Sequence, residues 1–85
     1  MASGELLGKV THFFDKINVA VIRLDRTVKA GEAVRFLGRV TDFEQAIDSM
    51  QVEHQPVQEG APGTEVAVKV LQSVRAGDSV YRANG

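Results

Sequence analysis

The chain repeats one stretch of eight residues: residues 27–34 read TVKAGEAV, and residues 73–80 read SVRAGDSV. Each copy runs apolar, basic, small, glycine and acidic before it enters a segment of strand-like residues. The glycine suits a turn position with positive φ, which β-branched residues cannot adopt. The repeat therefore predicts two equivalent turns in a pseudo-symmetric β-barrel, each leading the chain into a strand.

Apolar and polar residues alternate with a period of two on both sides of these turns. In residues 19–24, for example, Ala20 and Ile22 fall on one face and Arg23 on the other. No segment sustains the period of an α-helix. The pattern predicts strands at residues 6–14, 19–24, 33–38, 65–71 and 79–83, a tight turn from Asp15 to Asn18, and a loop from Gln55 to Gly63, which holds both prolines.

Residues 40–54 form the longest extended run, and their apolar phase slips by one residue along it. Phe43 and Ile47 share one parity, whereas Met50 has the other. A β-bulge at Asp48-Ser49 would absorb the slip and bend the strand. Bent strands of this kind are what a small closed barrel requires at its corners.

The size and composition of the chain allow one small folded domain. It has 85 residues, of which 44% are apolar and 25% charged, and it has no cysteine, so disulfides and thiolate chemistry are excluded. No apolar run approaches the ~20 residues of a membrane span, and the first residues lack the basic and apolar regions of a signal peptide. We expect a cytoplasmic protein in which residues 6–83 form one barrel domain between a disordered N-terminal tail at residues 1–5 and a C-terminal tail at residues 84–85.

The formal net charge of −1 hides an uneven distribution along the chain. Residues 1–39 carry seven bases and four acids, residues 40–68 carry six acids and no base, and residues 69–85 carry three bases and one acid. One interpretation is two solvated faces of opposite sign. The other is a basic surface that meets phosphate, with an acidic edge that sets orientation.

The sequence contains no motif for catalysis, metal binding or nucleotide binding. The dipeptide Gly8-Lys9 lacks the spacing and the following Ser or Thr of a phosphate-binding loop. The two histidines, His12 and His54, lie far apart and show no metal-ligand spacing. His12 alternates with Val10 and Phe14, which predicts a packed, hydrogen-bonded side chain. We therefore expect a protein that is not an enzyme and uses no cofactor, metal or nucleotide.

Two aromatic residues, Phe13 and Phe14, are adjacent, so in a strand one of them faces outward. Near Lys9 and Lys16, the outward ring could stack on a nucleic-acid base; the alternative is that it packs under a loop. The candidate RNA-binding residues are accordingly Lys9, Lys16, Arg23, Arg35, Arg39 and Phe13.

Several stretches resemble known barrels. Residues 27–38 (TVKAGEAVRFLG) and 73–80 resemble the second-domain barrel of translational GTPases such as elongation factor Tu. A closer resemblance, carried by GKVTHFF at 8–14, TDFEQ at 41–45 and SMQV at 49–52, is to the small barrel appended to collagenase-like peptidases and to its short stand-alone relatives. The resemblance spans residues 8–83 and implies an all-β, six-stranded closed antiparallel barrel with Greek-key connections.

Two functions follow as hypotheses. The resemblance to the translation-factor barrel, which helps to hold the 3′ end of aminoacylated tRNA, implies a non-catalytic module that contacts tRNA or ribosomal RNA through its basic surface. The alternative is a protein-interaction or accessory subunit that docks on a larger enzyme, or self-associates, and has no role with RNA. No membrane contact is expected in either case. RNA binding is favoured if Lys9, Lys16 and Arg23 converge beside an exposed Phe, and disfavoured if acids lie among them.

Overall fold

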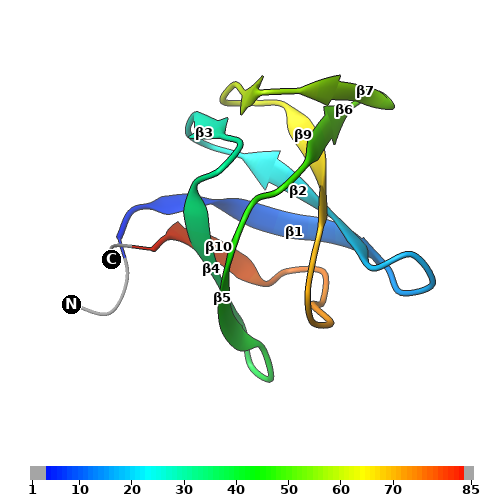
Figure 1. Cartoon of the computed structure of the whole chain (residues 1–85). Helices are drawn as coiled ribbons and strands as arrows, with labels where there is room; N and C mark the ends of the chain where they lie inside the picture. The colour runs from blue at the N-terminus through cyan, green and yellow to red at the C-terminus, as the bar shows by residue number, and fades with distance from the viewer. Residues whose placement is uncertain (1–3, 84–85) are drawn as a thin grey trace.

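The computed structural model describes residues 4–83, and this part of the chain is built of β-strands without a helix, as Figure 1 shows. The strands are β1 (Leu6–Phe14), β2 (Val19–Leu24), β3 (Val28–Lys29), β4 (Ala33–Leu37), β5 (Asp42–Ala46), β6 (Met50–Val52), β7 (Gln55–Val57), β8 (Glu59–Gly60), β9 (Glu65–Lys69) and β10 (Ser79–Arg82). Within this range no helix has the length and apolarity needed to cross a membrane.

Eight strands form one sheet in the order β5-β4-β10-β1-β2-β9-β6-β7, and β3 pairs with β8 as a separate ribbon. The expected all-β, barrel-like fold is confirmed. The closed ring of six strands is wrong, because the sheet curls into an open half-barrel whose end strands are β5 and β7 (Figure 1).

The extended run predicted at residues 40–54 is two strands, β5 and β6, which lie in different parts of the open sheet. β5 pairs with β4, whereas β6 pairs with β9 at the other side of the sheet. The predicted phase slip is confirmed, since Ile47 and Met50 are both buried. It is a break and not a bulge, because residues 47–49 belong to no strand and β5 and β6 pair with different neighbours. The Ile47 backbone extends the β4–β5 pairing into the turn before β4: its N–H donates to the Glu32 carbonyl at 2.9 Å, and its carbonyl accepts from the Gly31 N–H at 2.7 Å.

A buried side chain bridges the gap between β5 and the end of β9. The Gln45 amide donates from Nε2 to the Lys69 carbonyl at 2.9 Å, and its Oε1 accepts from the Leu71 N–H at 2.8 Å. The Gln45 Nε2 also lies 3.3 Å from the Ala46 carbonyl. One amide thus holds together two segments that share no strand ladder.

Replacing Gln45 by leucine should lower the free energy of unfolding by about 2 kcal/mol, because the Lys69 carbonyl and the Leu71 N–H lose their partner in a partly buried site. Urea denaturation followed by circular dichroism measures this change. The exposed Gln58 provides a matched control, and Gln58→Leu should leave the stability within about 0.5 kcal/mol. Equal losses in the two variants would contradict the bridging role.

The two repeated turns have the same geometry, as the sequence predicts. Gly31 and Gly77 have φ of 94° and 96°. In the first turn the Lys29 N–H donates to the Glu32 side chain at 2.9 Å, and in the second the Arg75 N–H donates to the Asp78 side chain at 2.9 Å. The turns lead into β4 and β10, which pair with each other within the sheet. The repeat therefore forms a pseudo-symmetric pair of strands.

The expected loop at residues 55–63 contains two short strands, β7 and β8. Pro56 lies in β7, which is the last strand of the sheet order, and an edge strand tolerates the missing N–H of proline. The hairpin that connects β6 to β7 turns at Glu53 and His54, whose φ values are 51° and 66°. The loop prediction is wrong at these residues, because strands of only two or three residues are too short to show an alternating pattern in the sequence.

The tails expected at residues 1–5 and 84–85 fall mostly outside the described residues. Gly4 and Glu5 are described, and both join the fold: the Gly4 N–H donates to the Arg82 carbonyl, and the Arg82 N–H donates to the Glu5 carbonyl, both at 2.8 Å. The two ends of the described chain therefore lie side by side (Figure 1).

The core lies inside the curl of the sheet and follows the predicted alternation. Its largest fully buried side chain is Phe36, whose ring stacks on Phe43 at a centroid distance of 5.1 Å. Around this pair lie inward residues of β1, β2, β9 and β10, including Leu7, Val10, Ala20, Ile22, Leu24, Val66, Val68 and Val80. The opposite side of these strands faces outward and carries the candidate site.

Candidate interaction surface

Two of the predicted basic residues meet on the outer side of the sheet. Lys9 of β1 and Arg23 of β2 are directly opposite each other in the antiparallel ladder, and Arg23 is also opposite Glu65 of β9. Residues opposite each other in a ladder point to the same face. Both bases are exposed, and neither forms an ion pair with any residue in the range 4–83.

Two further rows complete this surface. His12 and Ala67 flank Val21, and Phe14 and Lys69 flank Val19. We define the β1–β2–β9 face as the outward residues of the three rows, namely Lys9, His12, Phe14, Val19, Val21, Arg23, Glu65, Ala67 and Lys69.

An irregularity in β1 sets which aromatic residue reaches this face. The β1–β2 register shifts between Val10 and His12, and the Thr11 hydroxyl donates to the Val21 carbonyl at 3.2 Å. The shift turns His12 outward, so the expected packed and hydrogen-bonded His12 is wrong. Its exposed ring stacks instead on Phe14 at a centroid distance of 6.2 Å.

Phe13 and Phe14 point to opposite sides, as their adjacency predicts. Phe13 packs against the core and is only partly exposed, whereas Phe14 is 50% exposed. Phe13, the candidate stacking residue, is therefore the less accessible of the two rings. Its role in RNA binding stays a prediction. Phe14 is the aromatic ring that a ligand can reach.

The middle of the β1–β2–β9 face is apolar. Val19, Val21 and Ala67 are partly exposed there, between the exposed bases of the outer rows. The outer side of an antiparallel sheet is usually polar, so outward valines are informative. These outward residues were not predicted from the sequence, although the uninterrupted apolar run at residues 19–22 indicates that both sides of β2 are apolar.

A groove of about 680 Å³ lies over part of this face. Val21 and Ala67 line it together with the neighbouring pair Arg23 and Glu65, and the Glu53–His54 turn and the segment Gly63–Thr64 also line it. Positive φ at two consecutive non-glycine residues costs roughly 1 kcal/mol or more for each. The turn that borders the groove is thus held in a strained shape by the surrounding structure.

The other predicted basic residues do not join this cluster. The Arg35 guanidinium is engaged by Asp42, with Nε and Nη2 at 2.9 and 2.8 Å from Oδ1. Arg39 is exposed in the turn between β4 and β5, and Lys16 is exposed in the β1–β2 turn, next to Asp15. The six candidates therefore form no continuous patch, and only Lys9 and Arg23 act as neighbours.

Two exposed apolar residues lie at the end of β1 and β2. Ile17, in the turn, is 59% exposed, and Leu71, just after β9, is 77% exposed. A hydrogen bond from the Val70 N–H to the Asn18 carbonyl, 2.8 Å long, holds the two segments together. This apolar end adjoins the row of Phe14 and Lys69, so it extends the β1–β2–β9 face.

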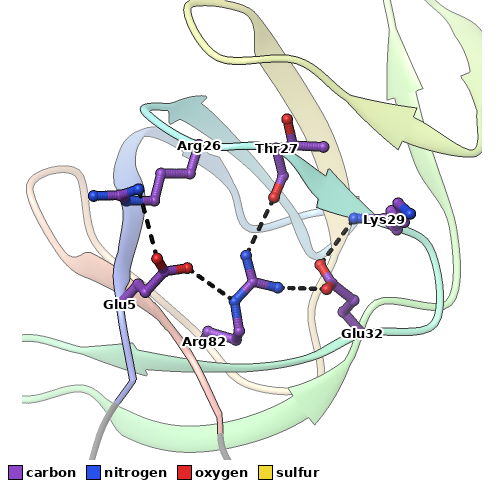
Figure 2. A network of polar contacts seen from close by, with 6 residues as sticks. All are labelled: Glu5, Arg26, Thr27, Lys29, Glu32 and Arg82. Atoms are coloured by element: carbon purple, nitrogen blue, oxygen red, sulfur yellow. Dashed lines mark hydrogen bonds and ion pairs between the residues drawn. The ribbon is translucent and has the colours of Figure 1, made fainter.

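The other end of β1 is polar, and its contacts stabilise the fold. Figure 2 shows the Arg82 guanidinium between the carboxylates of Glu5 and Glu32, with a third contact to the Thr27 carbonyl at 3.4 Å. Glu5 also pairs with Arg26 at 3.5 Å. These contacts join the first and last strands to the β3–β4 turn, and they neutralise Glu5, which therefore does not compete with the bases of the face.

The described residues place no three metal-ligating side chains together. The β1–β2–β9 face instead combines exposed aliphatic side chains, cationic groups and one carboxylate. Such a surface can bind a partner through apolar contact and charge complementarity.

Comparisons with known proteins show which of them resemble this chain in sequence or in fold. No protein-family model matches the chain. A protease of Methanocaldococcus jannaschii, named as uncharacterised, is 37% identical over 76 residues, which cover 88% of this chain and 19% of that protein. The chain thus spans about a fifth of the length of this curated relative.

Two similar solved structures are of the C-terminal domain of a putative U32 peptidase from Geobacillus thermoleovorans. The selenomethionine variant has a TM-score of 0.88 and 20% identity, and covers 92% of this chain and 99% of that domain. The other structure has a TM-score of 0.89 and 20% identity, and covers 94% of this chain and 93% of that domain. The likeness supports the resemblance to the peptidase barrel; the resemblance to the translation-factor barrel stays a prediction.

Proposed function

We propose that this protein is a non-catalytic accessory module that docks on a larger protein through the β1–β2–β9 face. The observation that carries the proposal is that the whole barrel matches a fifth of the length of a larger relative named a protease. A barrel that accompanies other domains needs a surface for them, and the apolar outward side of β2 supplies one.

The size of the chain also supports an accessory role. A folded unit of 85 residues has one core. The groove over the β1–β2–β9 face is open, and aliphatic residues are among those that line it. Any catalytic residues would therefore belong to the partner, and the barrel would contribute binding affinity or position the partner.

Affinity purification of the tagged protein from its own cells tests this function. One half of the lysate is treated with ribonuclease, and the recovered proteins and RNA are identified. We expect a larger protein to be recovered after ribonuclease and at about 200 mM salt, where binding dominated by phosphate contacts has weakened strongly. The purified partner and barrel should then re-form a complex of fixed stoichiometry in isothermal titration calorimetry.

Two results would contradict the proposal. Recovery of RNA alone at about 50 mM salt, lost by about 200 mM, would favour the RNA hypothesis. A barrel that sediments as a dimer and retains no other protein would identify self-association as its main interaction.

A further inference from the structure

We infer that the β1–β2–β9 face recognises a protein segment in which an apolar side chain follows carboxylates. Lys9 and Arg23 would receive the carboxylates, and Val21 and Ala67 would contact the apolar side chain. This inference rests on the proposed function and specifies the chemistry of the partner.

The charge of the face supports an acidic ligand. Lys9, Arg23 and Lys69 are exposed and make no ion pair within residues 4–83, whereas Arg35, Arg26 and Arg82 are all engaged by carboxylates of the chain itself. Three unpaired cations are thus gathered on neighbouring strands of one face, whereas the other cations without an ion pair in this range, Lys16, Lys29, Arg39 and Arg75, lie outside it. Lys9 and Arg23 are opposite each other in the ladder, so one acidic side chain can reach both.

The groove beside Arg23 supports an apolar contact. Val21 and Ala67 are opposite each other on β2 and β9, and both line it. The groove is bordered by the Glu53–His54 turn, so an aliphatic side chain placed on Val21 would be covered on more than one side. Burial of such a side chain contributes about 25 cal/mol for each Å² removed from water.

The distribution of acids favours a protein over RNA as the ligand. Glu65 and Glu53 both line the groove, a short distance along the face from Lys9 and Arg23. RNA carries a phosphate at every nucleotide and would bring charge against these carboxylates. A protein segment carries charges only where its sequence places them. Its carboxylates can therefore pair with Lys9 and Arg23 while its apolar side chain contacts Val21.

Nuclear magnetic resonance titration with two defined peptides tests this inference. The probe is the capped peptide Glu-Glu-Val-Leu-Gly-Ser, and the control peptide has lysine at both glutamate positions. We expect saturable shifts in the amide signals of Val21, Arg23 and Ala67 with the acidic peptide only. Arg23→Glu should weaken this binding about tenfold or more, because it replaces attraction by repulsion at the contact.

Arg39→Glu is the matched control, since Arg39 is an exposed arginine away from this face. It should leave the affinity for the acidic peptide unchanged. The inference is overturned by equal binding of both peptides, by shifts confined to another surface, or by the absence of shifts at millimolar peptide. Tighter binding of an oligouridine at the same amides would also overturn it and would identify an RNA surface.

Two variants of the face, Arg23→Glu and Val21→Asp, separate this inference from the proposed function. If a purified partner binds Arg23→Glu and Val21→Asp as tightly as the unaltered barrel, the partner uses another surface, and only the inference fails. If no protein partner is recovered, the proposed function fails, whatever the peptides show.

Discussion

Replacing Phe36 by alanine should lower the free energy of unfolding by about 3–5 kcal/mol, the range observed when a buried phenylalanine is truncated. Phe36 is fully buried, and its ring stacks on Phe43. It lies on β4, which pairs with both β5 and β10, so the lining of the resulting cavity is held on two sides. Because small domains are stable by about 5–15 kcal/mol, much of the stability of this barrel should be lost.

Phe14→Ala is the matched control for this prediction. It removes the same atoms from a ring that is 50% exposed, so the loss should be below about 1 kcal/mol. Urea denaturation of both variants, followed by circular dichroism, gives the comparison. Similar shifts of the two unfolding midpoints would show that Phe36 is not the centre of the core.

Gly8→Ala should cost about 3 kcal/mol, at the upper end of the range for overpacked sites. A Cβ atom at Gly8 would lie 2.1 Å from the Arg23 carbonyl oxygen, which belongs to the backbone of β2. A backbone atom of a paired strand cannot move away as the end of a flexible side chain can, so β1 and β2 must separate locally.

Hydrogen exchange of the β1 and β2 amides measures that separation directly. Exchange should become faster near Gly8 and Arg23 in Gly8→Ala. The adjacent and exposed Lys9 serves as control, and Lys9→Ala should preserve both the stability and the exchange pattern. Protection equal to that of the unaltered protein in Gly8→Ala would contradict the close approach.

The sequence was sufficient to predict the strands that alternate over five or more residues. β1 and β2 have the predicted bounds, because the Asp15–Asn18 turn and the inward aliphatic residues agree on one pairing. The short pairings of β3, β7 and β8 could not be predicted in this way, since two or three residues carry too little periodicity. They are fixed by contacts with segments distant in the chain.

In the candidate site, the adjacency of Lys9 and Arg23 could not be predicted from the sequence. Phe14 is opposite Val19, and counting back along an undisturbed ladder would place Lys9 opposite the core residue Leu24. The irregularity at Thr11 moves the register by one residue, and Lys9 therefore faces Arg23. Nothing in the local sequence marks this irregularity, so the two bases were predicted as candidates but their adjacency was not.

The position of β10 also governs when the barrel can form. β10 lies between β4 and β1 in the sheet, although it follows all the other described strands in the chain. Until it emerges from the ribosome, β4–β5 and β1–β2 are separate hairpins without a common sheet. Pairing of β1 with β10 joins strands at opposite ends of the described residues, a class of contact associated with slow folding. The nascent chain must therefore keep its apolar strands from aggregating until β10 has been made.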